Sequence, residues 1–194
     1  MAAGYGFADY GGMTLRSGFL ACLASLVFAG AALAQAPVDP KLRGKEIKGR
    51  DLEWSDFTGD VDQRSPLFAY TYWSVLYRFD RPVFRDGRAY IKPTVQLFFL
   101  PRSWVRPDRE SAELLEHERG HFKIGRLCAR LIESALTSAE YSPANYQKET
   151  AEVYSSTAAK CKDVESQYDL DTRHSANRER QAAWNQKLSD MLKD

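Results

Sequence analysis

The stretch of sequence that decides the fold is LLEHERGHFKIGRLC, residues 114–128. Its apolar and histidine side chains recur at intervals of three and four residues, which is the period of one face of an α-helix. The stripe continues beyond this stretch, and we expect a helix that Asp108 caps and that runs to about Leu136. Its inward side chains are predicted to be Leu114, His117, His121, Ile124, Cys128, Leu131 and Ala135.

The same stretch contains the motif H-E-x-x-H, from His117 to His121. Residues four apart lie one above the other on a helix, so both imidazoles can bind one zinc ion while Glu118 points toward the water on that ion. Zinc lowers the pKa of such a water to about 7, and the glutamate takes its proton as the water attacks a carbonyl group. The motif therefore predicts a zinc-dependent hydrolase with Glu118 as its general base.

Buried structural histidines are the alternative interpretation of this motif. Two neighbouring residues argue against it. Glu118 lies beside the apolar stripe, and Gly120 costs a helix interior about 1 kcal/mol relative to alanine. A hydrophobic core has little use for either residue, whereas a site that needs room beside a metal ion tolerates both.

The third zinc ligand has to come from another part of the chain, because a catalytic zinc ion takes three protein ligands and keeps one position for water. The chain has three histidines, and the one outside the motif, His174, is the preferred ligand. Tyr168 and Arg173 are candidates for stabilising the oxyanion that forms during attack. The alternative ligands are the acidic residues Glu149, Glu152, Asp169 and Asp171.

The region before the motif helix has the composition and the alternating pattern of a small β-sheet. Aromatic and β-branched residues are frequent, and polarity alternates with a period of two from Ala69 to Phe79. Asp86 and Gly87 predict a hairpin turn between two short strands, and Val95–Leu100 predicts a further strand. The last of these strands has an edge that could bind an extended peptide. We expect a mostly antiparallel sheet.

Two more helices are predicted after the motif helix. Ser142 and Pro143 are a typical cap and first-turn pair for a helix that runs to about Gln167. Thr172 is a candidate cap for a last helix, in which Gln181 and Trp184 are expected to pack. Because strands come first and helices follow, the predicted fold class is α+β, with three helices after the sheet.

The start of the chain is predicted to be a secretory signal peptide, residues 1–34. Arg16 precedes an apolar run, Phe19–Ala29, and a small-x-small cleavage site ends at Ala34. Met13 is then a better initiator than Met1, because the residues before it contain no base. The run is shorter than the ~20 residues that span a bilayer, so we expect export to the periplasm or outside the cell, without a stable membrane anchor.

The exported chain is predicted to consist of a flexible arm, residues 35–50, and one domain, residues 51–194. Two cysteines remain in it, Cys128 and Cys161. In an oxidising compartment they predict one disulfide, and two buried free thiols are the alternative. The bridge would join the second helix to the motif helix and hold the turn that carries His174 near the metal ion.

Composition excludes one class of partner. The formal net charge is +1, whereas a nucleic-acid-binding protein usually has a strong basic excess. At 44% hydrophobic and 27% charged residues, the chain is an ordinary globular protein. We expect a monomer whose partner is a peptide or protein substrate.

Three segments carry a resemblance to a known family: Trp54–Gly59, Leu115–Phe122 and the pattern Tyr168-Asp169-x-x-Thr172-x-His174. Over residues 52–187 the chain resembles the bacterial family of predicted secreted zinc-dependent proteases, catalogued as domain of unknown function 922. The family motif has glycine after the third histidine, where this chain has Ser175. The resemblance implies a zincin-like fold.

Three hypotheses therefore follow from the sequence. The first is a secreted or periplasmic zinc peptidase that hydrolyses peptide bonds. The second is a non-catalytic envelope protein with a structural metal site, which four protein ligands would close. The third is an interaction module that uses its aromatic-rich sheet and predicts an exposed apolar patch without metal dependence.

Overall fold

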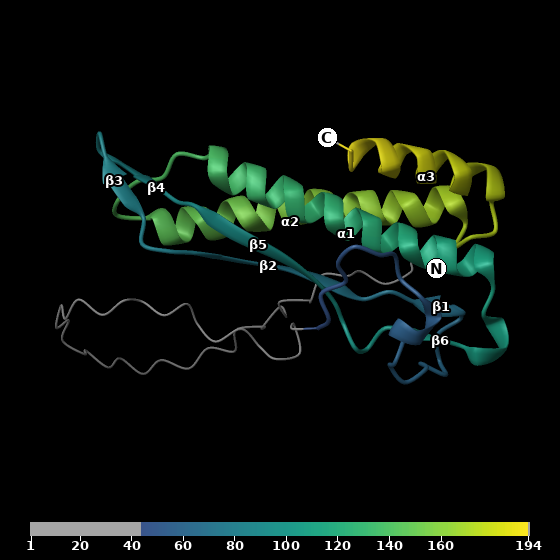
Figure 1. The fold of residues 1–194 in the computed structure, drawn as a ribbon. Coiled ribbons are helices and arrows are strands. Elements are labelled where there is room, and N and C mark those ends of the chain that lie inside the picture. Colours follow the sequence, from purple (N-terminus) through teal and green to yellow (C-terminus); the bar gives the residue numbers. More distant parts are fainter. Residues whose placement is uncertain (1–43, 194) are drawn as a thin grey trace, which may run out of the picture.

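The computed structural model describes residues 44–193. The predicted signal peptide, its cleavage site and Met13 lie outside the described residues. Antiparallel strands are followed by three helices, which confirms the predicted α+β class (Figure 1). The strands are β1 (Ala69–Tyr70), β2 (Trp73–Phe79), β3 (Val83–Arg85), β4 (Arg88–Tyr90), β5 (Pro93–Phe99) and β6 (Trp104–Val105). The helices are α1 (Ala112–Ser138), α2 (Tyr146–Thr172) and α3 (Arg178–Met191), with short 3-10 turns η2 (Trp54–Asp56) and η3 (Pro107–Arg109).

The strands form three antiparallel pairs, β1–β6, β2–β5 and β3–β4. The single alternating strand predicted for residues 69–79 is interrupted at Thr71 and Tyr72, because β1 pairs with β6 while β2 pairs with β5. The long β2–β5 ribbon lies under α1 (Figure 1). Gly125 permits this close approach, since a Cβ atom there would lie 3.0 Å from both Trp73 and Leu97.

Helix α1 carries the predicted inward stripe through its first four turns. Ser111 caps it by accepting a hydrogen bond from the Leu114 amide at 3.1 Å, whereas the predicted cap, Asp108, belongs to η3. In the last turns the buried positions become Ile132 and Leu136, and Leu131 is 43% exposed. The prediction of Leu131 was wrong because the face of a 3.6-residue helix shifts gradually against a fixed three-and-four spacing.

Helix α2 begins later and ends later than predicted. Its cap is Asn145 instead of Ser142, whose amide and hydroxyl donate to the Glu149 carboxylate. The helix continues to Thr172, which is its last residue and not the cap of α3. Asn177 caps α3 by accepting from the Arg180 amide. The extra turn of α2 decides the site, because it places the segment around residue 169 on a helix that packs on α1.

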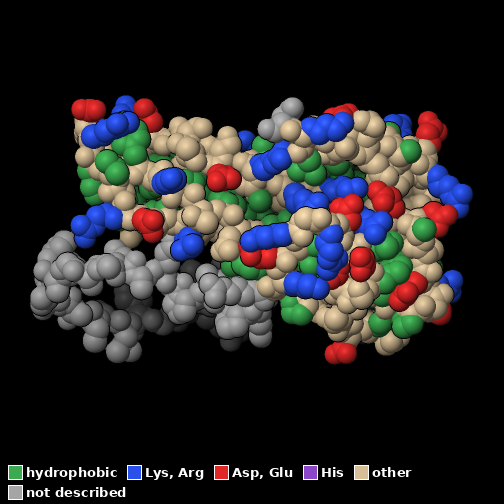
Figure 2. All heavy atoms as spheres, in the orientation of Figure 1, with side chains coloured by type: hydrophobic (Ala, Val, Ile, Leu, Met, Phe, Trp, Pro, Cys, Tyr) green, Lys and Arg blue, Asp and Glu red, His purple; other side chains and the backbone are tan. Residues whose placement is uncertain are grey.

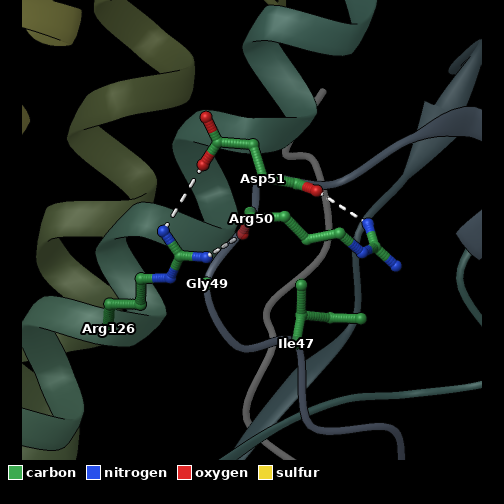
Figure 3. Close-up of a pocket in the computed structure, with 5 residues that line it drawn as sticks. All are labelled: Ile47, Gly49, Arg50, Asp51 and Arg126. Carbon is green, nitrogen blue, oxygen red and sulfur yellow. Dashed lines mark hydrogen bonds and ion pairs between the residues drawn. The ribbon is translucent and has the colours of Figure 1, made fainter.

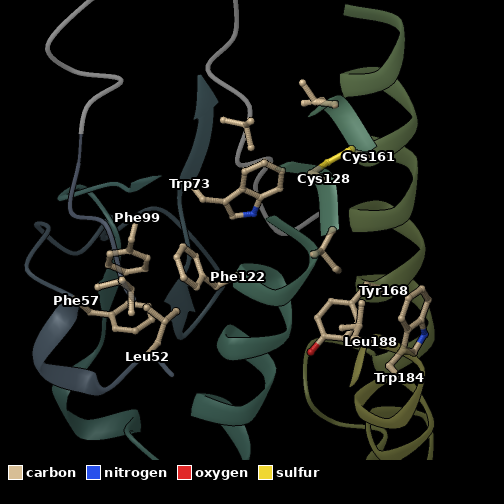
Figure 4. Packing of buried hydrophobic residues seen from close by; sticks show 14 of the residues in the cluster. Leu52, Phe57, Trp73, Phe99, Phe122, Cys128, Cys161, Tyr168, Trp184 and Leu188 are labelled. Carbon is tan, nitrogen blue, oxygen red and sulfur yellow. A yellow bond between two sulfur atoms is a disulfide. The ribbon is translucent and has the colours of Figure 1, made fainter. Parts of the chain in front are cut away.

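The core has two parts on either side of α1 (Figure 4). Trp73, Phe99 and Phe122 fill the space between the strands and α1, and Tyr168 with Leu188 fills the space between the helices. The predicted disulfide between Cys128 and Cys161 is confirmed, and it joins α1 to α2 with the two Cα atoms 5.9 Å apart. No described helix is both long and apolar enough to cross a membrane.

Residues 44–50 pack on the domain, although they were predicted to belong to the flexible arm, residues 35–50. Lys45 exchanges two backbone hydrogen bonds with Phe99, at 2.8 and 2.9 Å, and Ile47 is buried. The Asp56 carboxylate binds the side chains of Lys45 and Arg50, which ties this segment to η2. The segment and α1 border a surface pocket (Figure 3), lined by Ile47, Gly49, Arg50, Asp51 and Arg126.

Candidate metal centre

His117 and His121 lie one helical turn apart on the face of α1 that is turned to α2. Both are only 2% exposed. Their Nε2 atoms are 3.2 Å apart, and the two rings meet edge to face. The i, i+4 spacing of the motif therefore brings two nitrogen donors to one point inside the protein.

The third donor is Asp169, from the last turn of α2. Its Oδ1 atom lies 3.3 Å from His117 Nε2 and 3.2 Å from His121 Nε2. These three side chains are buried and form a group that could bind a metal ion. Asp169 Oδ1 is itself buried and makes no hydrogen bond of good geometry with any described residue. Two imidazoles and a carboxylate are a donor set that first-row divalent metals accept, so the residues fit a cation.

Each histidine is oriented by a second polar side chain. His117 Nδ1 lies 3.1 Å from Gln181 Oε1, and His121 Nδ1 lies 2.9 Å from Glu165 Oε2. These contacts occupy the Nδ1 atoms and leave both Nε2 atoms toward Asp169. Supporting contacts of this kind fix the tautomer and the ring orientation of histidines that bind metals.

The charges of the centre are strongly coupled. Burial alone would lower the pKa of His121, but the carboxylates of Glu165 and Asp169 outweigh burial and raise that pKa well above its ordinary value. Burial opposes the ionisation of Asp169, yet the charge of His121 and the surrounding imidazoles hold the pKa of Asp169 well below its usual range. Burial raises the pKa of Glu165. His121 and Asp169 therefore stabilise each other's charged forms, and a cation beside Asp169 would also stabilise its carboxylate.

The motif glutamate, Glu118, is also buried, at 3% exposure. Its Oε2 atom accepts a hydrogen bond from Thr71 Oγ1 at 2.6 Å. Thr71 lies between β1 and β2, so the interruption of the predicted long strand supplies the partner of the motif glutamate. This contact fixes one oxygen of the carboxylate in place.

Tyr168, predicted to stabilise an oxyanion, instead contacts the backbone and the ring of His117. Its hydroxyl donates to the backbone oxygen of His117 at 2.9 Å and accepts from Gln181 Nε2 at 2.7 Å. Its ring stacks on the His117 ring, with the centroids 4.8 Å apart. A Cβ atom on Gly120 would collide with the Tyr168 hydroxyl. The space beside Gly120 is therefore filled by Tyr168 and is not left open for a metal ion, and Tyr168 supports the position of His117.

His174, the preferred third ligand, lies beside the group of three and outside it. Its Nδ1 atom is 3.2 Å from Asp169 Oδ1, and its side chain is 30% exposed. It follows the end of α2, in a turn where Arg173, His174 and Ser175 all have positive φ. The geometry therefore favours Asp169 over His174, because α2 continues past Gln167 and carries Asp169 to α1.

The three remaining acidic candidates for the third ligand point to partners outside the centre. Asp171 accepts a hydrogen bond from Trp184 Nε1 at 2.9 Å. Glu149 binds Ser142, and Glu152 pairs with Lys148 at 3.6 Å on the surface.

No sequence pattern predicted Glu165 or Thr71 at the centre, and Gln181 was expected only to pack in the last helix. The spacing of Glu165 and Asp169, four residues apart, is the signal that could have found the first. For Thr71 no local pattern exists, because its partner Glu118 is 47 residues away along the chain.

The model of a family described as bacterial protein of unknown function (DUF922) matches residues 46–175. This range includes the motif, Asp169, His174 and both cysteines, and it ends before α3. No curated protein and no solved structure matches the chain.

Proposed function

Because the chain belongs to the bacterial protein family of unknown function DUF922, whose description names no activity, we propose its function from the site: a zinc-dependent peptidase. Its ligands are His117, His121 and Asp169, and Glu118 is its general base. The substrate is a peptide or protein whose backbone amide is hydrolysed.

One observation carries the proposal. The three donor atoms are 3.2, 3.3 and 3.2 Å apart. Zinc binds nitrogen and oxygen ligands at about 2.0–2.1 Å, so two ligands of a tetrahedral site lie about 3.3–3.4 Å apart. The three side chains thus have the spacing of three corners of such a site, and only the fourth corner is left for water or substrate.

Each residue around the proposed zinc ion has a separate role in hydrolysis. When bound, zinc supplies Lewis acidity, which polarises a carbonyl group and makes a water more acidic. Glu118 accepts the proton of the attacking water and delivers it to the leaving amine. Thr71 holds one oxygen of that carboxylate at 2.6 Å, so the remaining lone pairs take up the proton. Glu165 and Gln181 keep the two imidazoles aligned through the Nδ1 atoms.

Substrate reaches this site from the side of His174 in our proposal. The ligand side chains and Glu118 are buried, whereas the His174 side chain is 30% exposed. His174 is therefore a partly exposed residue in direct contact with a proposed ligand, Asp169.

A structural metal site is the second candidate, and the burial of the centre favours it. If His174 moved slightly, its Nδ1 atom, now 3.2 Å from Asp169 Oδ1, would become a fourth protein ligand. Four protein ligands are typical of structural zinc, and three are typical of catalytic zinc. In the peptidase, His174→Ala keeps zinc affinity within about threefold of the wild type. In the structural site, His174→Ala loses zinc as severely as Asp169→Ala.

The test of the proposed activity compares Glu118→Gln with the matched variant Glu116→Gln. Both glutamates are on α1, but Glu116 is partly exposed and pairs with Lys123 at 3.3 Å. We expect both variants to bind one zinc ion. Loss of a general base costs about 100- to 10,000-fold in hydrolysis of a casein or peptide-library substrate, so only Glu118→Gln should lose activity. A zinc-loaded wild type without measurable hydrolysis, or equal activity in both variants, contradicts the peptidase.

We also propose that the chain works outside the cytoplasm. The Cys128–Cys161 disulfide supports this location, because disulfides persist in oxidising compartments and are rare in the cytosol. Fractionation of cells that express the full chain tests it, and a purely cytosolic, reduced protein would contradict it.

A further inference from the structure

The β3–β4 hairpin exposes two adjacent large apolar side chains. Val83 is 62% exposed and Phe84 is 53% exposed. The strands are joined by a tight turn at Asp86 and Gly87, both with positive φ, and the hairpin stands at one end of the molecule (Figure 1). The other exposed large apolar residues of the described chain are separated in sequence: Phe68, Leu131, Leu170 and Met191.

Packing within the protein accounts for only part of this surface. Phe84 pairs with the buried Ala89 and meets the edge of the Tyr146 ring, with the centroids 6.0 Å apart. Val83 pairs with Tyr90 and lies on the opposite face of the hairpin, because successive strand residues alternate in direction. Apolar surface is therefore open to solvent on both faces of the hairpin.

Basic residues outnumber acidic ones along the hairpin and its flanks. From Arg78 to Lys92 the sequence contains five basic residues and two acidic ones, although the whole chain has a net charge of only +1. Arg88 is paired with Glu140, and the Arg85 guanidinium lies 4.5 Å from the centroid of the Tyr90 ring. Arg81 and Lys92 are exposed. Figure 2 shows apolar and basic side chains together, with some acidic ones, at this end of the molecule.

The hairpin is far from the metal centre. It lies near the C-terminal end of α1, whereas His117 and His121 are near the N-terminal end (Figure 1). From His121 to Ser138 the helix is about 25 Å long, at 1.5 Å per residue. A surface bound by the hairpin would therefore leave the centre accessible.

We propose that residues 81–92, which we call the hairpin tip, dock on an anionic phospholipid surface. Val83 and Phe84 enter the boundary between headgroups and acyl chains, and the neighbouring arginines contact the headgroup phosphates. Addition of a strand from a protein partner fits less well, because β3 has three residues and is bordered by Pro82, and flanking charges discourage strand pairing. This docking does not depend on the peptidase activity.

Vesicle binding tests the proposal. The protein is the chain from Gln35, which contains every described residue and lacks the apolar run of the predicted signal peptide. Vesicles of equal parts phosphatidylglycerol and phosphatidylcholine are compared with pure phosphatidylcholine by co-sedimentation at low salt. We expect binding to the anionic vesicles alone. Phe84→Ser and Val83→Ser should each weaken it about tenfold, because burial of such a side chain contributes about that factor. Arg81→Gln should weaken it about fivefold.

Two matched controls lie at other sites. Phe68 is 47% exposed with Arg109 over its ring at 4.7 Å, so Phe68→Ser removes a comparable surface. The Arg64 side chain is 96% exposed, so Arg64→Gln removes a comparable charge. Neither control should weaken vesicle binding by more than about twofold. Absence of binding to anionic vesicles, or an equal loss in the controls and the hairpin variants, overturns the proposal.

Discussion

Asp56 and Asp169 are both buried carboxylates, but their surroundings differ. Asp56 accepts hydrogen bonds of 2.7 Å from the side chains of Lys45 and Arg50, and one of 2.9 Å from the Glu53 amide. Asp169 Oδ1 is surrounded by three imidazole nitrogens at 3.2–3.3 Å, without a well-formed hydrogen bond to any described residue. The protein supplies the cations of the first site and leaves the second incomplete.

This difference in partners indicates that Asp56 has a structural role, whereas Asp169 is a candidate functional residue. Asp56 and its partners lie within 11 residues of one another along the chain, and both partners are permanently charged. Asp169 meets two imidazoles from α1 and one from the turn after α2, and an imidazole carries a positive charge only when it is protonated. A divalent cation would stabilise the Asp169 site and would do nothing for the Asp56 site.

The largest expected effect is the loss of metal binding in Asp169→Asn. This change keeps the shape of the side chain and removes its charge. Supporting partners of metal ligands contribute about 10- to 100-fold in affinity, so removal of a ligand should cost more than about 100-fold. Chelator competition with zinc at constant pH measures it. Asp171→Asn is the control, since Asp171 binds Trp184 instead. Wild-type affinity in Asp169→Asn would remove Asp169 from the ligand set.

Glu165→Gln tests the support of the centre and should have a smaller effect. The amide oxygen still accepts from His121 Nδ1 but lacks the charge, so zinc affinity should fall about tenfold, the lower end of the range for such partners. The same competition measures it, with Glu152→Gln as an exposed control on α2. If zinc affinity is unchanged while His121→Ala abolishes it, Glu165 does not support the histidine.

Asp56→Asn should show the opposite pattern, with lower stability and unchanged metal affinity. The neutral amide leaves Arg50 and Lys45 without their counter-ion. Both partners are partly exposed, so the free energy of unfolding should fall by only about 2 kcal/mol. Urea denaturation measures it, and Asp62→Asn, at a more exposed pair, is the control. If Asp56→Asn lowers the free energy of unfolding by less than Asp62→Asn does, the ion pairs of Asp56 do not stabilise the fold.

The smallest expected effect is a pH dependence of the stability difference between the wild type and Asp56→Asn. The Arg50 hydrogen bonds hold the pKa of Asp56 well below its unfolded value of about 3.9. The contribution of Asp56 is therefore complete above about pH 5 and is lost as the pH falls toward the folded pKa, because the unfolded chain binds the proton first. Urea denaturation of wild type and Asp56→Asn from about pH 7 to 3 should give converging stabilities. If the difference in the free energy of unfolding stays constant over this pH range, the pKa of Asp56 is not lowered by folding.

Local patterns predicted the elements that depend on neighbouring residues. The three-and-four spacing predicted α1, and Asp86-Gly87 predicted the β3–β4 turn, because both patterns express geometry within a few residues. Element ends were less accurate. The predicted end of α2 at Gln167 is five residues short of Thr172, because side chains of the last turn of α2 contact His117 of α1.

The centre was predictable only in part for the same reason. His117 and His121 follow from their spacing. Gly120 was interpreted as room beside a metal ion, whereas the Tyr168 hydroxyl fills that room and donates to His117, 51 residues away. Asp169 was one of several acidic candidates, and no local pattern distinguished it from Asp171.

By itself, then, the sequence determined that this chain forms strands followed by helices and places a histidine pair on one helix face, and it favoured a Cys128–Cys161 disulfide over two free thiols. Short-range periodicity and residue chemistry carry that information. The tertiary structure alone decided that Asp169 completes the group and that Glu165, Gln181 and Thr71 support it. Those contacts depend on how α2, α3 and the segment between β1 and β2 pack on α1, and such packing joins residues more than 40 positions apart.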